Sequence, residues 1–364
     1  MSPSSVGDPL PLSLTLLTSQ VAAASLAIAM LLAILVPALA SADETLAEVP
    51  DPLSLEQALS FATTHPRVIA ADQLLRSEAK AAGSAAGSAA GSVSGSAAGP
   101  LELPRAQPLY LGCHSLAFRG ARDHDAERDV AWSALLSNAD AQRLEIMQRF
   151  YDVLLADLSF ARDNEAMAVA FIQFDRAEAR EELGQFSPLR TAELQAEYQL
   201  IRGQRAASEA AQRLTRALLA TALGHPSSLP RQLVTPAFDA SPAEPPALDA
   251  IVNAALNNNQ GIKILMQDRS DAEQALVRMA LRERALELLT RLELLQVIAE
   301  QARSESDWRD LKLDESRTLY ELEAKADLGF SMSQQTKARR DEQETVFCRA
   351  LTHAELNALQ GLAP

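Results

Sequence analysis

Two long helix-forming segments of the sequence meet at Leu183-Gly184-Gln185-Phe186-Ser187-Pro188. Residues 129–183, before this junction, contain no glycine and no proline, and residues 190–223, after it, contain a single glycine, Gly203. Glycine can adopt the positive φ that ends a helix, and serine followed by proline is typical of the start of the next one. The sequence therefore predicts an antiparallel helical hairpin with its turn at this junction.

The first segment carries apolar residues at the spacing of one helical face. They are Met147, Tyr151, Leu154 and Leu158. At the rise of an α-helix, the two arms of the hairpin could reach roughly 80 Å and roughly 50 Å. Helices of this length are typical of a rod, a tube or a coiled coil rather than of a compact globular core.

The composition agrees with long helices and narrows the classes of partner. The chain has 364 residues, of which only 4% are aromatic, and its formal net charge is −15. This balance argues against binding nucleic acid, which requires a basic surface. It leaves a membrane protein possible.

The two cysteines, Cys113 and Cys348, stand far apart in unrelated contexts. Their number and spacing do not imply a disulfide framework. Pairing between them remains an alternative for an oxidising compartment.

The N-terminal segment has the pattern of a secretory signal peptide. Residues 21–40 are almost wholly apolar and lead into the cleavage-like sequences Ala38-Leu39-Ala40 and Ala40-Ser41-Ala42. Residues 1–20 lack the usual Lys or Arg. A retained transmembrane helix is the alternative, because about 20 apolar residues can span a bilayer.

The second half of the chain repeats the first. Residues 248–275 parallel residues 55–81, and residues 276–326 again contain no glycine or proline. The sequence Asp327-Leu328-Gly329-Phe330-Ser331 echoes the first junction. We therefore predict an all-α fold of long antiparallel coiled-coil helical hairpins in two tandem repeats, with at most a residual β-strand segment at 107–118.

These patterns divide the chain into four segments. They are a signal peptide at 1–42, a first helical-hairpin repeat at 43–225, a proline-rich linker at 226–247 and a second repeat at 248–364. Within the first repeat, residues 81–100 are a Gly/Ser/Ala tract. This tract fits either a flexible linker or a helix face of small residues.

Several short sequences resemble those of the TolC family of outer-membrane efflux proteins. They are Leu53-Ser54-Leu55-Glu56-Gln57-Ala58-Leu59 followed by His65-Pro66, a second such opening at 248–262, the run at 218–226, and the Leu-Gly-x-x-Ser junction with its echo. No single one is diagnostic, but their duplicated order covers most of the chain after the signal peptide.

The resemblance implies an outer-membrane channel component of a tripartite export system. It implies a homotrimer whose helices form a periplasmic tunnel, whose strands close a barrel in the outer membrane, and whose partners are a membrane-fusion adaptor and an inner-membrane pump. Carried over by position, the adaptor-docking turns would be Leu183, Gly184, Gln185, Phe186 and Ser187, together with Leu328, Gly329, Phe330 and Ser331. Phe186 and Phe330 also fit a simpler role, in which each seals its own turn.

The chain departs from the family where strands are expected. The Gly/Ser/Ala tract takes the place of one strand, and residues 276–300 continue as charged helix without a strand pair. This favours an alternative function, a periplasmic coiled-coil protein that has no barrel, binds partners and transports nothing.

Catalytic and metal-binding patterns find little support. The polar residues Cys113, His114, Asp123, His124 and Asp125 lie near the strand candidate, but their spacing fits no standard metal site. The sequence has no common nucleophile, phosphate-loop or zinc-hydrolase motif. We therefore expect no enzyme activity and no cofactor.

Overall fold

A computed structural model describes residues 48–85, 105–120, 135–238, 246–267, 269–322 and 328–363. For residues 78–85 it describes the backbone only. Residues 48–364 belong to one compact unit. The regular elements within these ranges are all helices, which confirms the all-α class. The predicted signal peptide and most of the Gly/Ser/Ala tract lie outside the described residues, although the first residues of that tract continue helix α2 to Ala85.

The first predicted hairpin is present, with α5 at Asn138–Glu182 and α6 at Pro188–Ala222. Its turn has the predicted chemistry. Gly184 has a φ of +69°, the Ser187 side chain accepts a hydrogen bond from the Arg190 backbone N–H, and Pro188 opens α6. Helix α5 begins after its N-cap Ser137, later than the sequence pattern suggested.

The second hairpin pairs α9, Asp271–Glu321, with α10, Leu328–Leu359. The expectation that residues 328–331 form its turn is wrong, because they are the first turn of α10. A Cβ on Gly329 would clash with Cγ2 of Val169 on α5. This glycine therefore permits the close approach of two helices rather than a reversal of the chain.

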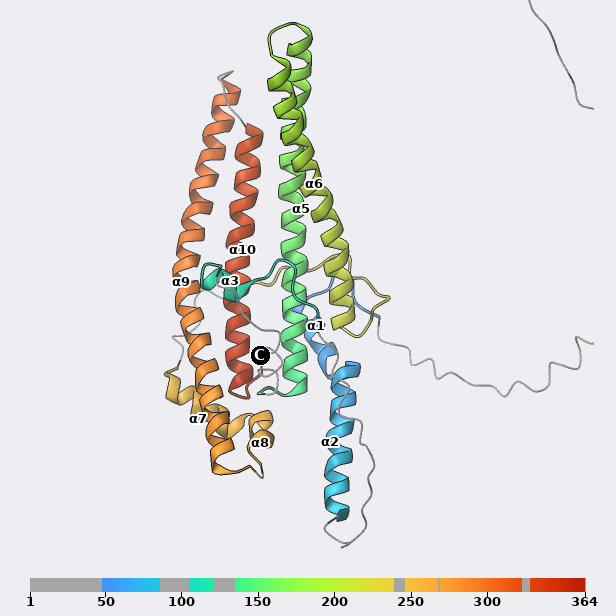
Figure 1. Ribbon diagram of the computed structural model, residues 1–364, viewed down its shortest axis with the longest axis vertical. Helices are drawn as coiled ribbons and strands as arrows, with labels where there is room; N and C mark the ends of the chain where they lie inside the picture. Colours follow the sequence, from blue (N-terminus) through green and yellow to red (C-terminus); the bar gives the residue numbers. More distant parts are fainter. Residues whose placement is uncertain are drawn as a thin grey trace, which may run out of the picture. The chain divides into compact units, whose positions relative to one another are not determined.

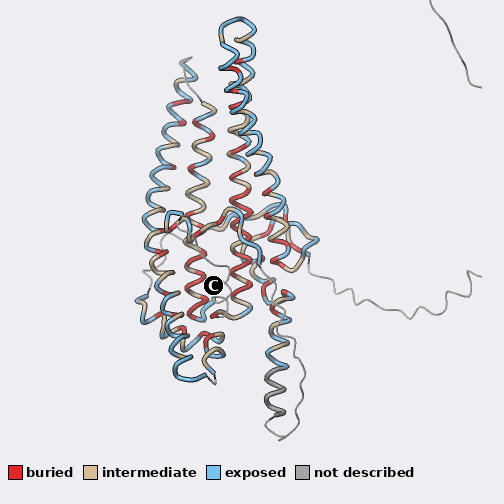
Figure 2. Tube along the Cα trace, viewed as in Figure 1, coloured by how far each residue is buried: buried red, intermediate tan, exposed pale blue. Residues whose placement is uncertain are grey.

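The four long helices lie side by side in the order α9, α10, α5, α6 (Figure 1). Among the four long helices, the central pair, α5 and α10, carries most of the buried residues, whereas the outer sides of α6 and α9 are largely exposed (Figure 2). Tyr151 of α5 stacks on Phe347 of α10 with ring centroids 4.7 Å apart. Of the predicted apolar face, Met147, Tyr151 and Leu154 are buried and Leu158 is half-buried.

Short helices pack against one end of each long pair. Helices α1, Leu55–Ser60, η1, Phe61–Thr64, and α2, Pro66–Ala85, contact α5. Helices α7, Leu248–Asn258, and α8, Gln260–Met266, contact α9. The predicted capping box between Ser54 and Gln57 begins α1.

The predicted strand at 107–118 is wrong. Residues Cys113–Ala117 form a short helix, α3, and the segment before it binds a side chain instead of another strand. The backbone N–H groups of Leu109, Tyr110 and Leu111 all donate to the Asp152 carboxylate, at 2.8, 2.5 and 3.1 Å. Among the described residues the β pairing is limited to one isolated bridge between Leu53 and Leu233.

The two hairpins end in the same way. Gly224 after α6 and Gly361 after α10 both have positive φ, +81° and +74°. The next residue donates its backbone N–H to the carbonyl five residues earlier, His225 to Ala220 and Leu362 to Asn357. This is the hydrogen-bond pattern of a Schellman motif.

Each of these ends contacts the residue that begins a short helix of the same half. His65, before α2, contacts the Thr221 carbonyl through Nε2 at 3.1 Å. Asn259, before α8, donates its amide Nδ2 to the carbonyls of Ala358 and Leu359. Each side chain also accepts a backbone N–H of its own helix. The likeness between the two halves thus extends to their ends, which supports the proposal of an internal duplication.

Candidate functional site

The turn between α5 and α6 presents the first set of residues carried over from the family. The backbone N–H groups of Gly184 and Gln185 close it on the carbonyls of Glu181 and Arg180, both at 2.8 Å. The Arg180 guanidinium lies over the Phe186 ring, 5.3 Å from its centroid. Two leucines remain exposed around the turn, Leu183 at 72% and Leu189 at 71%. Phe186 therefore helps to seal the turn, and the leucines are its accessible apolar side chains.

The second set does not form an equivalent surface. Leu328, Gly329, Phe330 and Ser331 are helical. Ser331 is buried and lies 2.7 Å from Ser316 of α9, hydroxyl oxygen to hydroxyl oxygen. Phe330 is 52% exposed, but its side chain extends from a helix and not from a turn.

Helix α9 carries two apolar stripes. One is buried toward the rest of the unit and includes Leu281, Ala285, Leu288, Leu292, Leu295 and Leu313. The other is exposed and consists of Met279, Leu286, Val297, Trp308, Leu311 and Leu322, the last at the C-cap. We call this second set the outer stripe. A helix turns about 100° per residue, so the outer stripe spans about 60° and lies roughly opposite the buried one.

Helix α6, at the other edge, exposes a face of smaller residues. Small side chains dominate it, namely Ala192, Ala196, Gly203 and Ala210, together with the exposed Leu189, Leu200 and Leu214. A Cβ on Gly203 would have open space around it. The bulky outer stripe of α9 and this small-residue face of α6 thus lie on opposite edges of the same row of helices.

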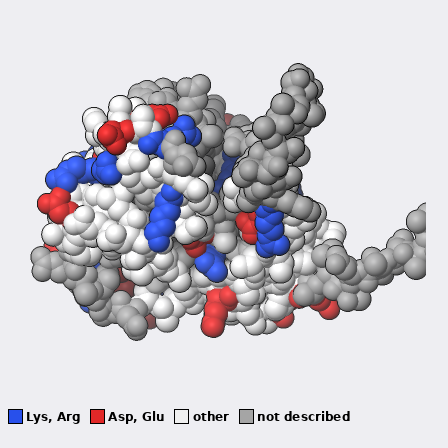
Figure 3. Space-filling view, turned by 90° about the horizontal axis from the view of Figure 1, so that it is seen from below, with Lys and Arg blue, Asp and Glu red and all other residues white. Residues whose placement is uncertain are grey.

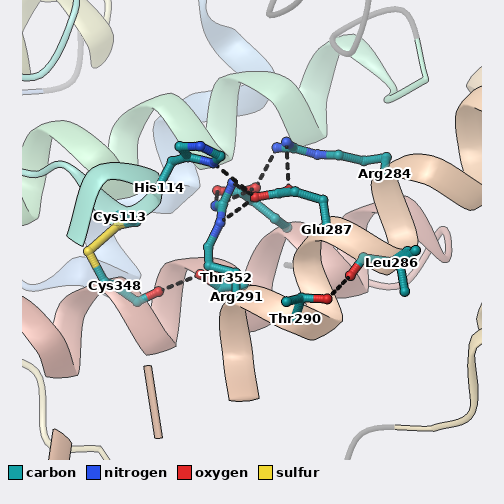
Figure 4. Close-up of polar contacts among 10 residues, drawn as sticks. Cys113, His114, Arg284, Leu286, Glu287, Thr290, Arg291, Cys348 and Thr352 are labelled. Carbon is teal, nitrogen blue, oxygen red and sulfur yellow. Dashed lines mark hydrogen bonds and ion pairs between the residues drawn. A yellow bond between two sulfur atoms is a disulfide. The ribbon is translucent and has the colours of Figure 1, made fainter. Parts of the chain in front are cut away.

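A buried charge cluster joins α9, α10 and α3 (Figure 4). We call His114, Arg284, Glu287, Arg291 and Glu355 the second charge cluster. Arg291, whose side chain is only 4% exposed, pairs with Glu287 at 2.7 Å and with Glu355 at 3.3 Å. Arg284 pairs with the same two carboxylates. Burial raises the pKa of Glu287, but the charges of Arg291 and Arg284 outweigh it, so the pKa lies below its usual value.

The two cysteines form a disulfide beside this cluster. Cys113 of α3 is bonded to Cys348 of α10, so the chain does contain the cross-link that the cysteine spacing did not imply (Figure 4). The neighbouring His114 places Nδ1 3.3 Å from Glu287. The disulfide and this contact together hold α3 on the second hairpin.

A different buried cluster lies where α2 and the segment before α3 meet α5. We call Arg67, Arg105, Glu145 and Arg149 the first charge cluster. Arg67 Nη1 and Arg105 Nε approach the same oxygen, Oε2 of Glu145, at 2.9 and 3.0 Å. Arg149, 2% exposed, donates Nη2 to the Ala106 carbonyl. The sequence pattern did not single out these residues, because their partners lie on three separate segments.

A groove of about 530 Å³ runs between α5, α6 and α10. Its charged side chains already have partners, Arg162 with Asp163 at 2.7 Å and Lys337 with Asp341 at 3.0 Å.

Within the described ranges, no group of three His, Cys, Asp or Glu side chains could hold a metal ion, and no helix there is long and apolar enough to cross a membrane. On the face seen in Figure 3, acidic and basic side chains are interspersed.

Comparison with known proteins leaves the family open. The sequence matches no protein-family model and no curated protein. The structure aligns with one of CusC, from work on its folding and transmembrane channel formation, with a TM-score of 0.49 and 10% identity over 84% of this chain and 95% of that chain. It aligns with a membrane protein from Pseudomonas aeruginosa at a TM-score of 0.39 and 12% identity over 68% and 72% of the two chains. TM-scores this low do not indicate function, so a functional proposal for this chain must rest on the geometry of its own residues.

Proposed function

We propose that copies of this chain assemble side by side into a closed helical tube, which serves as the outer-membrane component of an export system. The outer stripe of α9 is the observation that supports this most directly. A helix with apolar residues on two opposite faces is stable when both faces are covered. The second face of α9 has no cover within the described part of the chain, and Val297 and Leu311 on it are 62% and 70% exposed.

The small-residue face of α6 on the next copy is the partner that fits this stripe. Along the row α9, α10, α5, α6 the chain direction alternates, and α6 runs opposite to α9 (Figure 1). Adding α9 of a second copy beside α6 continues the alternation. The contact joins two different faces, so it repeats from copy to copy until a ring closes. Three copies are what the resemblance to the TolC family implies.

The compartment is inferred from two independent features. The apolar segment at 21–40 directs export from the cytoplasm, and the Cys113–Cys348 disulfide persists in an oxidising compartment such as the periplasm. Both support a location outside the cytoplasm, and the resemblance to the TolC family implies that this location is the periplasm and outer membrane of a Gram-negative cell.

The assembly is tested by placing a charge in the middle of the outer stripe. The variant Val297→Glu is compared with Gln296→Glu, which adds the same carboxylate on the adjacent, non-stripe side of α9. We measure the mass of the mature chain, extracted from the cell envelope, by light scattering. Wild type and Gln296→Glu are expected as oligomers and Val297→Glu as a monomer. A monomeric wild type would contradict the proposed tube. So would a Val297→Glu variant that remains oligomeric.

We propose further that the α5–α6 turn docks the membrane-fusion adaptor, through the exposed Leu183 and Leu189. A photo-crosslinking residue at position 183 tests this in cells, with the same residue at the exposed position 199 on α6 as the control. The expected product is a crosslink to an envelope adaptor from position 183 and none from position 199. Equal crosslinking from both positions would remove the turn from the interface.

A second function is a coiled-coil protein of the periplasm that binds partners but transports nothing. It is favoured by the short connection between α8, which ends at Met266, and α9, which begins at Asp271, because a strand pair does not fit there. Conductance across planar lipid bilayers separates the two functions. Discrete channel openings from the purified oligomer support transport, and an oligomer that never conducts supports the second function.

A further inference from the structure

The first charge cluster holds more positive charge than its carboxylates neutralise. Three guanidinium groups, of Arg67, Arg105 and Arg149, surround the single carboxylate of Glu145. Among the described residues, Asp152 also acts on Arg149, but its carboxylate already accepts three backbone N–H groups. Even if Asp152 is counted, three positive charges face two negative ones. Such an excess is unusual in a chain whose net charge is −15.

The neighbouring histidine does not alter this balance. His65 Nδ1 accepts the Arg67 backbone N–H, while Nε2 contacts the Thr221 carbonyl. These two contacts require a neutral ring with its proton on Nε2. Burial also lowers the pKa of His65.

One donor of the cluster has no partner. Arg149 Nη1 is buried and makes no hydrogen bond with any described residue. Nη1 belongs to the same planar group as Nη2, which donates to Ala106, so it lies next to the segment that carries Arg105. A buried, unpaired charged donor is costly, so its retention points to a missing acceptor.

The electrostatics of the arginines agree with a missing anion. Burial lowers the pKa of Arg105, and the charges of Arg67 and Arg149 lower it further against the opposite effect of Glu145. Burial likewise lowers the pKa of Arg149, and Arg67 adds to this, although Glu145 and Asp152 oppose it. Arg67 and Arg149 therefore each repel Arg105, and Arg67 also repels Arg149.

We propose that the first charge cluster is a binding site for a small oxyanion, such as inorganic phosphate or a carboxylate. Guanidinium groups match the geometry of such anions through paired N–H donors. The side chains of Arg67 and Arg105 are 31% and 35% exposed, so the anion reaches the cluster from solvent between them. It would accept from these two arginines and from Arg149 Nη1. The site goes beyond the proposed tube, because none of its residues lies on the exposed faces of α6 or α9.

Isothermal titration calorimetry on the purified mature chain tests the site. Sodium phosphate and sodium acetate are titrated separately, each against sodium chloride at the same ionic strength. We expect saturable binding of one anion per chain, and a melting temperature that rises with the concentration of that anion. The phosphate and acetate arms identify which oxyanion fits better. The proposal would be overturned if chloride bound as tightly as phosphate and acetate. It would also be overturned if neither phosphate nor acetate gave a saturable heat of binding.

Three variants separate the site from the general charge of the protein. Arg105→Gln removes one partly exposed guanidinium and should weaken binding about tenfold or more. Arg143→Gln is the matched control, because Arg143 lies on α5 with a side chain 32% exposed and pairs with Asp140 outside the cluster. Arg149→Met removes the unpaired donor and should abolish binding. If Arg149→Met does not fold, Arg105→Gln decides alone, and equal loss in Arg105→Gln and Arg143→Gln would contradict the site.

Discussion

The two buried charge clusters differ in their ratio of arginines to carboxylates. The first has three arginines and one glutamate, and one of its guanidinium nitrogens has no hydrogen-bond partner in the described part of the chain. The second has two arginines and two glutamates, with His114 at its edge. The first lies where α2 and the segment before α3 meet α5, and the second lies where α3 meets α9 and α10.

This difference separates a structural cluster from one suited to a ligand. A buried ion pair is tolerated when the partners satisfy each other, and breaking it leaves an uncompensated charge. The second cluster meets that condition within the chain. The first does not, and an external anion would complete it. The comparison therefore predicts where a substitution is costly and where it is mild.

The largest effect is expected from Glu355→Ala in the second cluster. Removing this carboxylate takes one charged partner from Arg291, which is almost fully buried, and one from Arg284. We expect a loss of about 3–5 kcal/mol in the free energy of unfolding, measured by urea denaturation. Glu305→Ala, which breaks an exposed i,i+4 pair with Arg309, is the control and should cost less than about 1 kcal/mol. Similar costs for both variants would mean that the second cluster is not structural.

The disulfide should give the next largest effect, because it joins the segment before α5 to α10 beside the second cluster. The double variant Cys113→Ala, Cys348→Ala removes the cross-link and frees α3 from the second hairpin. We expect about 2–4 kcal/mol of destabilisation in the same assay. Reductant should lower the stability of wild type and leave the double variant unchanged. A wild type that is indifferent to reductant would show that the cross-link contributes little.

The glycines that end the two hairpins should respond unequally to alanine. Both have positive φ, which costs a residue with a Cβ about 1–2 kcal/mol. The added Cβ in Gly361→Ala would also meet the Asn258 and Asn259 backbone at 2.7 Å, whereas in Gly224→Ala it would meet the Pro66 side chain at 3.3 Å. Gly361→Ala should therefore cost more stability than Gly224→Ala. The reverse order in urea denaturation would mean that the end of α10 yields more easily than its contacts suggest.

The helical hairpins could be predicted from the sequence because local chemistry defines them. Glycine at a positive φ, serine with proline at a helix start, and long runs without helix breakers act within a few residues. The same reasoning failed at Gly329, where the glycine serves contact with Val169, some 160 residues away in the sequence. A glycine that permits close packing and a glycine that ends a helix look alike in one sequence.

The charge clusters and the disulfide could not be predicted for a related reason. Arg149 and Asp152 lie on a part of α5 that is buried on all sides. In the sequence alone they look like part of an exposed polar helix face, because their partners are not known. Those partners are the backbone carbonyl at 106 and the backbone N–H groups at 109–111, and the sequence predicts a strand, not a side-chain contact, from residue 107 on. Cys113 and Cys348 are 235 residues apart, and their pairing depends on how α3 lies on α10.

We expect the smallest effect from a substitution at His65, the residue before α2. It is replaced by the residue type found at the corresponding place before α8. His65→Asn places in the first half the residue type that Asn259 supplies in the second. Asparagine is a good N-cap and does not titrate, so stability at neutral pH should change little. The informative quantity is the dependence of stability on pH.

His65 should make wild type less stable in acid. Its pKa in the folded chain lies below the value near 6.5 expected when unfolded, so the unfolded chain takes up the proton first as the pH falls. Stability should therefore be lost below about pH 6.5, by at most about 1.4 kcal/mol per pH unit for one histidine. In His65→Asn the contribution of His65 to the pH dependence of stability should disappear. The contribution of His353, whose pKa burial also lowers, should remain. An unchanged slope in His65→Asn would mean that folding does not lower the pKa of His65.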